Sequence, residues 1–250
     1  MIGRTRAVVL AAGLGSRLGP ATLRRPKCLM RVGGHTLLDR AMGAMAATGV
    51  AACTVVVGHL AASVRHCADA WAPQLDVRCV ENPEFATTGT ARSLALGIGD
   101  VAPNEDLLVV EADVVFERAT LQRLLSMPGP VTTVVAPFTP PVSGSAVLCA
   151  PDGRVLDWLH AEHQGPEFRR EDARKTVNLT RLDPPSAVVL RDRCAAARPD
   201  AALERVLRYV VQRRELAVRA MDVEDARWWE IDTPDDLRIA EELFREEPAG

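Results

Sequence analysis

Short apolar segments alternate along most of the chain with segments whose apolar residues recur at helical spacing. Continuous apolar runs predict buried strands over residues 7–12, 52–57, 77–80, 106–110 and 131–137. Apolar residues at helical spacing predict helices over residues 36–48, 60–71 and 90–96. Buried strands that alternate with helices are typical of a parallel sheet covered on both faces. The pattern therefore predicts an α/β fold that binds ligands outside the carboxyl ends of its strands.

The pattern changes after about residue 140. Two apolar segments, residues 145–150 and 155–159, flank the turn Pro151-Asp152-Gly153 and predict an antiparallel hairpin. The polar stretch 162–174 is expected to be a mobile loop. A strand over 175–179, a helix over 201–213 and a strand over 217–223 are expected to follow. Thr233, Pro234 and Asp236 form a capping-box pattern, so the last helix is expected to begin at Pro234, with a frayed tail over 246–250.

Composition excludes several classes of protein. The 250 residues are 48% hydrophobic and 25% charged, with a net charge of −3, so no basic face indicates nucleic-acid binding. No apolar run approaches a membrane span, and the first strand leaves no room for a signal peptide, so we expect a cytoplasmic protein without membrane contact. Six scattered cysteines suit a reducing compartment. The cysteines and histidines do not have the spacing of a zinc site. A Ser-His-Asp or Cys-His arrangement is not recognisable either, so we expect a reaction without a nucleophilic side chain.

The first apolar run ends in a glycine-rich loop with cations. Gly13-Leu14-Gly15-Ser16-Arg17 is followed by Arg24-Arg25-Pro26-Lys27. Glycines leave backbone N–H groups unobstructed, and amides that converge with cations suit a polyphosphate. Only Lys27 and Lys175 are lysines among the 30 basic residues, which favours sites where a compact ammonium meets a phosphate oxygen. An ordinary strand-to-helix turn in an arginine-biased chain is the alternative.

Further candidates follow the other predicted strands. Small hydroxyl residues surround Gly89 at a helix start, where they either cap the helix or bind a ligand. Asp113 follows the fourth strand, and Asp232 precedes the last helix. A carboxylate at the end of a buried strand is costly unless it meets a cation or a metal ion, so a capping or ion-paired role remains open. Two such carboxylates at one sheet edge can share Mg²⁺ that also holds phosphate oxygens.

The glycine loop differs from a Walker A motif and from a dinucleotide-binding fingerprint. Leu10–Arg17, with Pro26-Lys27, instead resembles the LAAGxGxR…PK signature of the nucleotidyltransferases. The resemblance extends through Gly89-Thr90-Ala91, Asp113 and Asp232, over nearly the whole chain. It implies the nucleotide-diphospho-sugar transferase fold, which is a Rossmann-like, mostly parallel mixed sheet with helices on both faces and a small antiparallel insertion.

The resemblance also implies a division of labour within one domain, residues 1–250. A nucleotide-binding part would cover about 1–140, an acceptor-binding part about 141–235, and a C-terminal helix 234–246. Lys27, Arg17, Asp113 and Asp232 would be catalytic, with Mg²⁺ on the two aspartates. The residues expected to bind the nucleotide are Leu10, Ala11, Ala12, Gly13, Gly15, Ser16, Arg17, Asn82, Gly89, Thr90 and Ala91.

Within this family the chain looks most like the cytidylyltransferases that act on phosphocholine or small phosphonates. Ala112–Val115 and Glu230-Ile231-Asp232 carry that likeness, and Lys175–Asn178 resembles the phosphonate branch. The implied reaction transfers CMP from CTP to 2-aminoethyl- or 2-hydroxyethylphosphonate and releases pyrophosphate. The residues expected to contact the acceptor are Lys175, Asn178, Thr88, Arg92 and Ser93.

Several alternatives stay open at this point. Few aromatic residues, among them the single tyrosine Tyr209, argue against the aromatic cage that holds choline. Trp228 and Trp229 could form half of such a cage, so a phosphocholine acceptor remains an alternative. So do a sugar-1-phosphate nucleotidyltransferase and a catalytically silent nucleotide-sensing module. A homodimer is one of the oligomeric states left open.

Overall fold

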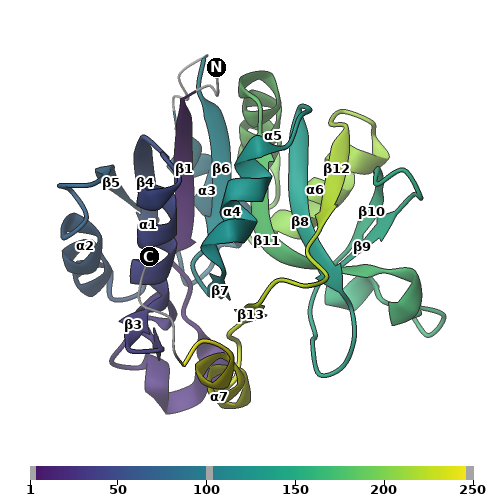
Figure 1. The fold of residues 1–250 in the computed structure, drawn as a ribbon. Helices are drawn as coiled ribbons and strands as arrows, with labels where there is room; N and C mark the ends of the chain where they lie inside the picture. Colours follow the sequence, from purple (N-terminus) through teal and green to yellow (C-terminus); the bar gives the residue numbers. More distant parts are fainter. Residues whose placement is uncertain (1–3, 100–103, 246–250) are drawn as a thin grey trace.

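A nine-stranded mixed sheet forms the centre of the protein (Figure 1). The computed structural model describes residues 4–99 and 104–245. Its strands run in the order β10-β9-β11-β6-β1-β4-β5, and β8 pairs with β11 and β12. Strands β6, β1, β4 and β5 are parallel, whereas β11 is antiparallel to both β6 and β8. The strands are β1 (Thr5–Ala11), β4 (Ala52–Val57), β5 (Asp76–Glu81), β6 (Asp106–Glu111), β8 (Val131–Pro137), β9 (Ala146–Cys149), β10 (Val155–Leu159), β11 (Arg174–Leu182) and β12 (Val218–Asp222).

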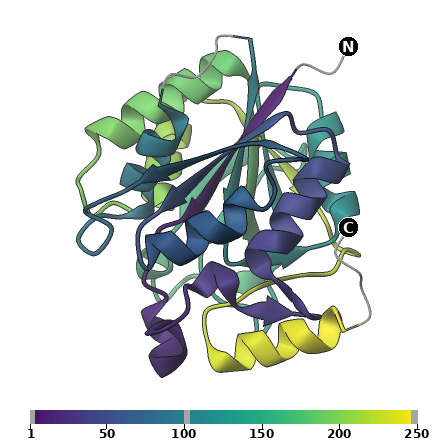
Figure 2. The same ribbon diagram turned by 90° about the vertical axis from the view of Figure 1, so that its left-hand side faces the viewer.

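Helices cover both faces of this sheet, as the apolar pattern predicts. Alternate residues of β1 point to opposite faces: Ala7 and Val9 pack with α1, α2 and α4, and Val8 and Leu10 pack with α3, α5 and α6. Figure 2 shows α1 and α5 on opposite sides of the twisted sheet. The helices are α1 (Leu37–Ala47), α2 (Ala61–Asp69), α3 (Thr90–Ile98), α4 (Arg118–Ser126), α5 (Pro184–Ala196), α6 (Leu203–Gln212) and α7 (Pro234–Leu243). None of the helices in the described part of the chain is long and apolar enough to cross a membrane.

A second, two-stranded sheet connects the end of the chain to its middle. β13 (Trp228–Glu230) runs antiparallel to β7 (Val114–Phe116), with Glu230 opposite Val114. The backbone N–H of Ile231 then donates to the carbonyl of Asp113 over 2.9 Å. This pairing lays residues 230–232 against the segment that follows β6. Two parts of the sequence more than a hundred residues apart therefore meet at the carboxyl ends of the parallel strands.

The last helix begins where its sequence pattern predicts. The Thr233 hydroxyl accepts a hydrogen bond from the backbone N–H of Asp236, and the Asp236 carboxylate accepts one from the backbone N–H of Thr233. Both halves of the capping box are thus present. The helix ends at Leu243, short of the expected residue 246. The tail over 246–250 lies outside the described residues.

Other expectations need correction. Helices α4 and α5 occupy stretches for which the apolar pattern predicted neither a helix nor a strand. The stretch 162–174, expected to be a mobile loop, contains two short 3₁₀ helices, Ala161–His163 and Arg170–Asp172. It is tied to the 142–144 segment, because the Gln164 side chain donates to the carbonyl of Gly144 and Arg170 to that of Val142, each over 2.7 Å. The strand expected over 175–179 is longer, Arg174–Leu182, and lies inside the sheet between β6 and β8.

Candidate active site

The glycine-rich loop turns sharply after β1 and brings its end back to the sheet edge. Gly15 has φ of 63°, in the left-handed region that favours glycine. A Cβ at Gly15 would lie only 3.0 Å from the Cβ of Lys27 and from the Thr22 side chain. The Thr22 hydroxyl donates to the carbonyls of Gly15 and Gly19 and so holds the turn. Gly15 is required here both for the turn and for the close approach of Lys27.

Lys27 lies between the two aspartates. Its Nζ is 2.8 Å from Oδ2 of Asp113 and 2.6 Å from Oδ1 of Asp232. Arg17 reaches the same Oδ1 of Asp232 over 2.8 Å. Burial acts to lower the pKa of the Lys27 ammonium, but the two carboxylates outweigh it and hold that pKa above its usual range. The structure therefore brings together all four residues predicted to be catalytic.

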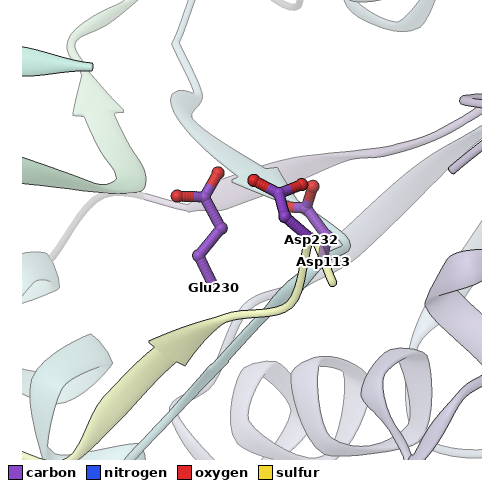
Figure 3. Close-up of side chains that lie close together, drawn as sticks. All are labelled: Asp113, Glu230 and Asp232. Carbon is purple, nitrogen blue, oxygen red and sulfur yellow. The ribbon is translucent and has the colours of Figure 1, made fainter. Parts of the chain in front are cut away.

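A third carboxylate, Glu230, completes this group. One oxygen from each of Asp113, Glu230 and Asp232 lies within 4.8 Å of the others (Figure 3). Oδ1 of Asp113 is buried and has no hydrogen-bond partner among the described residues, so one oxygen is left for a ligand to satisfy. Three carboxylates are hard oxygen donors of the kind that Mg²⁺ prefers. The residues present therefore fit a magnesium site. Glu230 was missed because only its spacing of two from Asp232 pointed to it.

Lys175 and Asn178 face Glu230. The Nζ of Lys175 is 2.8 Å from Oε2 of Glu230 and donates to the carbonyl of Thr176 over 2.7 Å. The Asn178 side chain donates to Oε1 of Glu230 over 3.1 Å. Asn178 has φ of 60° at an irregularity in the pairing of β11 with β8. With 1% of its surface exposed, Lys175 does not line the cleft described below, so its contact with an acceptor stays a prediction.

A cleft of about 220 Å³ opens at the carboxyl ends of β1 and β6. Among the predicted acceptor residues, Thr88 and Ser93 line it, and Arg92 does not. Of the predicted nucleotide residues, Asn82 and Ala91 lie outside its walls. The lining comprises Leu10, Ala11, Ala12, Gly13, Gly15, Ser16, Arg17, Lys27, Cys28, Phe85, Thr88, Gly89, Thr90, Ser93, Glu111, Ala112, Asp113 and Asp232.

Asn82 supports the wall of the cleft from behind. It is buried, and its amide donates to the hydroxyls of Thr88 and Ser93 over 2.9 and 3.0 Å. Gly89 packs so tightly on the start of α6 that a Cβ there would lie 2.0 Å from the carbonyl oxygen of Ala201. None of these hydroxyl residues caps α3, which has no side-chain cap. The hydroxyl of Thr90 instead accepts a hydrogen bond from the backbone N–H of Leu203, the first residue of α6, over 2.7 Å. The loop is therefore built as a rigid wall.

Glu111 is a further cleft residue that the sequence pattern did not single out. It ends β6 beside Leu10 of β1, and no ion pair joins it to a cation in the described part of the chain. Burial raises the pKa of its carboxyl well above the usual range, and the charges of Glu204, Asp113 and Glu230 raise it further, against the opposing effect of the Lys175 ammonium. Glu204 accepts a hydrogen bond from the Ser145 hydroxyl over 3.0 Å. This side of the cleft consequently carries more carboxylates than cations.

The comparisons with known proteins agree with this geometry. A family model described as the MobA-like NTP transferase domain matches residues 7–215. CMP-5'-(3-aminopropyl)phosphonate synthase of Streptomyces rubellomurinus is 36% identical over 249 residues, which cover 96% of this chain and 38% of that protein. The 2-aminoethylphosphonate cytidylyltransferase of Lancefieldella rimae is 31% identical over 112 residues, 45% of this chain and 44% of that protein. The matched segments thus cover less than half the length of each of these two relatives.

Solved structures show the same fold. The CTP:phosphocholine cytidylyltransferase of Streptococcus pneumoniae has a TM-score of 0.77 and 21% identity, with 96% of this chain and 99% of that one covered. The inositol-1-phosphate CTP transferase of T. maritima has a TM-score of 0.74 and 22% identity, with 97% and 96% covered. At such low identity the likeness concerns the fold alone. The expected nucleotide-diphospho-sugar transferase fold is confirmed.

Proposed function

The chain belongs to the family of MobA-like NTP transferase domains, and on that premise we propose that it transfers CMP from CTP to a small phosphonate and releases pyrophosphate. The observation that carries this proposal is the position of Lys27 between Asp113 and Asp232, beside the glycine loop and Arg17. Glycine amides and cations suit a triphosphate, and adjacent carboxylates suit its metal ion. The names of the relatives support the choice of CTP and of a phosphonate.

In the proposed reaction a phosphonate oxygen attacks the α-phosphorus of CTP, and the bond from that phosphorus to the departing pyrophosphate breaks. The nucleophile is already an anion, so the chain's residues act by position and by charge rather than as a base. Arg17 and the loop amides hold the departing pyrophosphate, and Lys27 offsets the charge that develops on the α-phosphate. Asp113, Asp232 and Glu230 would hold Mg²⁺, which when bound neutralises charge on the oxygens of both substrates.

Among phosphonates, we propose an acceptor that carries an amino group. Glu111 lines the cleft without an ion-pair partner in the described chain, and Glu204 and Glu230 lie close enough to raise the pKa of its carboxyl. An ammonium group on the acceptor supplies the positive charge that this side lacks, and it favours the ionised carboxylate of Glu111. A hydroxyl group supplies no such charge. The relatives named for aminopropyl- and aminoethylphosphonate support the same choice.

The phosphocholine alternative lacks a cage of several aromatic rings in the cleft, where Phe85 is the aromatic side chain among the lining residues. Lys175 Nζ lies 5.9 Å from the centroid of the Trp228 ring, and the two tryptophan rings stack on each other with centroids 6.5 Å apart. The Trp229 indole also donates to Asp236. Tyr209 contacts Arg193 and Arg213 on α5 and after α6, and it does not line the cleft. Nothing specific favours a sugar phosphate or a silent sensor over the phosphonate reaction.

The test is a pyrophosphate-release assay with the full chain, CTP and Mg²⁺. The acceptors are 2-aminoethyl-, 3-aminopropyl- and 2-hydroxyethylphosphonate, phosphocholine and glucose 1-phosphate, and mass spectrometry identifies each CMP adduct. We expect the aminoalkylphosphonates to give the highest kcat/KM. UTP and dTTP serve as matched nucleotide controls. Adducts formed only with a sugar phosphate, or nucleotide binding without turnover of any acceptor, would contradict the proposal.

The role of Glu111 is tested in the same assay. Glu111→Gln keeps the shape of the side chain and removes its charge. We expect the ratio of kcat/KM for aminoethyl- to hydroxyethylphosphonate to fall about tenfold or more, the size of one lost charge-assisted contact. Glu84→Gln, at an exposed position near the same wall, is the matched control. An unchanged ratio in Glu111→Gln would assign the ammonium group to another residue.

A further inference from the structure

The carboxylates of the candidate metal site are already neutralised by the protein's own cations. Three carboxylates, those of Asp113, Glu230 and Asp232, form the acidic group. Three cations contact them: Lys27 contacts both aspartates, Arg17 contacts Asp232, and Lys175 contacts Glu230. The formal charges of this set add up to zero. A free divalent cation therefore meets a site with little net attraction for it.

The position of Lys27 conflicts with a metal ion that binds the same two aspartate oxygens. Its Nζ donates hydrogen bonds to Oδ2 of Asp113 over 2.8 Å and to Oδ1 of Asp232 over 2.6 Å. An ion bound to both oxygens would sit about 2.0–2.1 Å from each. Such an ion and the ammonium would compete for the same space between the same two atoms, and their charges would repel. Either Lys27 or the metal ion can hold these two oxygens at one time.

The two lysines differ in how easily each can move away from its carboxylate partners. The side chain of Lys27 is 13% exposed and lines the cleft, so its flexible stem can turn toward a bound phosphate. The side chain of Lys175 is 1% exposed and is also bonded to the carbonyl of Thr176. Glu230 in turn is held at its other oxygen by Asn178. The pair of Lys175 and Glu230 is therefore fixed, and of the two lysines only Lys27 can exchange its partners.

We propose, on the basis of the proposed function, that Lys27 is the internal counter-ion of Asp113 and Asp232, and that a divalent cation enters by displacing its ammonium toward the phosphates of the nucleotide. The displaced charge needs an anion to receive it, and the triphosphate is that anion. Metal ion and nucleotide consequently bind with positive coupling, and each binds weakly alone. The site then assembles only when both are present, which protects it from free metal ions.

The experiment measures binding without turnover. Free Mn²⁺ is titrated into the full chain and followed by electron paramagnetic resonance, and CTP affinity is measured by calorimetry with and without Mn²⁺, in the absence of any acceptor. Lys27→Met removes the counter-ion, and Lys27→Arg retains its charge. Arg238→Met makes the same change in net charge as Lys27→Met at an exposed position on α7, away from the cleft. Circular dichroism verifies that each variant is folded.

We expect Lys27→Met to bind free Mn²⁺ at least about tenfold more tightly than the parent chain, because two carboxylates lose their counter-ion. The coupling between Mn²⁺ and CTP should be about tenfold or more in the parent and should shrink in Lys27→Met. Lys27→Arg and Arg238→Met should bind free Mn²⁺ as the parent does. Equal or weaker Mn²⁺ binding by folded Lys27→Met would overturn the exchange.

This outcome is separable from the proposed function. Turnover by the parent chain together with unchanged Mn²⁺ affinity in Lys27→Met would reject the exchange and leave the cytidylyltransferase standing. Tighter Mn²⁺ binding in Lys27→Met together with no turnover of any acceptor would support the exchange and reject the proposed function.

Discussion

The protein contains two lysine–carboxylate sites that look alike in chemistry and differ in their surroundings. At the wall of an open cleft, Lys27 joins Asp113 and Asp232. Inside the sheet, Lys175 joins Glu230, and 1% of this lysine is exposed. The two sites touch, because Glu230 belongs to the same acidic group as the aspartates. The ion pair of Lys27 can open, whereas the ion pair of Lys175 cannot.

The physical reason lies in solvation. When a pair beside water opens, each charge is partly solvated again, so the loss is modest. When a buried pair loses one partner, the other charge remains in a medium that cannot solvate it, and the loss is about 3–5 kcal/mol. Lys27 can therefore exchange its partners during a reaction. Lys175 acts best as a fixed support that holds Glu230 in one orientation.

The largest effect is expected at Asp232, the residue that joins Lys27 and Arg17. Asp232→Asn keeps the size of the side chain and removes the charge that both cations contact. Because the change removes one candidate metal ligand as well, kcat/KM should fall about 10³-fold or more in the pyrophosphate-release assay. Asp235→Asn, three residues away and exposed, should keep nearly full activity. Comparable activity in the two variants would exclude Asp232 from the reaction.

The second prediction compares the two lysines by stability. Lys175→Met leaves the Glu230 carboxylate without its cation and should lower the free energy of unfolding by about 3–5 kcal/mol, as measured by urea titration. Lys27→Met should lower it by less than half as much, because Asp232 keeps its ion pair with Arg17 and the side chain of Asp113 is 22% exposed. The double variant Lys175→Met/Glu230→Gln should recover much of the loss. Equal destabilisation by the two single variants would remove the distinction between the sites.

The same comparison explains what could be predicted from sequence. The Lys27 site depends on residues that are close in sequence, so the turn at Gly15 and the cations that follow it were recognisable from their spacing alone. Asp113 was recognisable because a charged residue follows an apolar strand. The meeting of Asp113 with Glu230 depends on the pairing of β7 with β13, two three-residue strands whose alignment no local pattern specifies. The sequence therefore predicted that Asp113 and Asp232 share one sheet edge, and it did not predict that Glu230 joins them.

Lys175 illustrates the opposite limit. Its rarity in an arginine-rich chain pointed to a special role, and the structure gives it a special place. Rarity could not say whether the ammonium faces a ligand or a carboxylate, because both demand a compact cation. The bulge in β11 and the positive φ of Asn178 decide its orientation, and neither follows from apolar periodicity. Helix α5 was missed although Asp183 caps it and Pro184 begins it, because the exposed Val188 beside the buried Ala187 obscures the apolar stripe in the sequence.

A third, smaller effect is expected at Glu111, between the two sites. The pKa of the Glu111 carboxyl is raised in the folded protein. Below the pKa of the unfolded state Glu111 does not lower the stability, and stability is lost as the pH rises through the pKa of the folded state. Glu111→Gln stays neutral throughout. Its melting temperature should exceed that of the parent at pH 8 and should match it near pH 3.5, where Glu111 is largely protonated in the folded and unfolded states alike. Equal melting temperatures at both pH values would show that an unidentified cation balances Glu111.

The smallest expected effect, at Asn178, tests whether the fixed site is held by backbone or by side chain. Asn178→Ala loses the hydrogen bond to Glu230 and also places an alanine at φ of 60°, so it should cost about 2 kcal/mol. Asn178→Gly loses the same hydrogen bond but tolerates that backbone conformation, so its free energy of unfolding should lie within about 1 kcal/mol of the parent. Urea titration of both variants separates the contribution of the hydrogen bond from that of the backbone conformation. If Asn178→Gly is stable and yet shows a raised KM for the acceptor with CTP affinity unchanged, the amide acts by orienting Glu230, and the fixed site serves the acceptor through that carboxylate. If KM also stays unchanged, Lys175 alone suffices to hold Glu230, and the asparagine is there for its backbone.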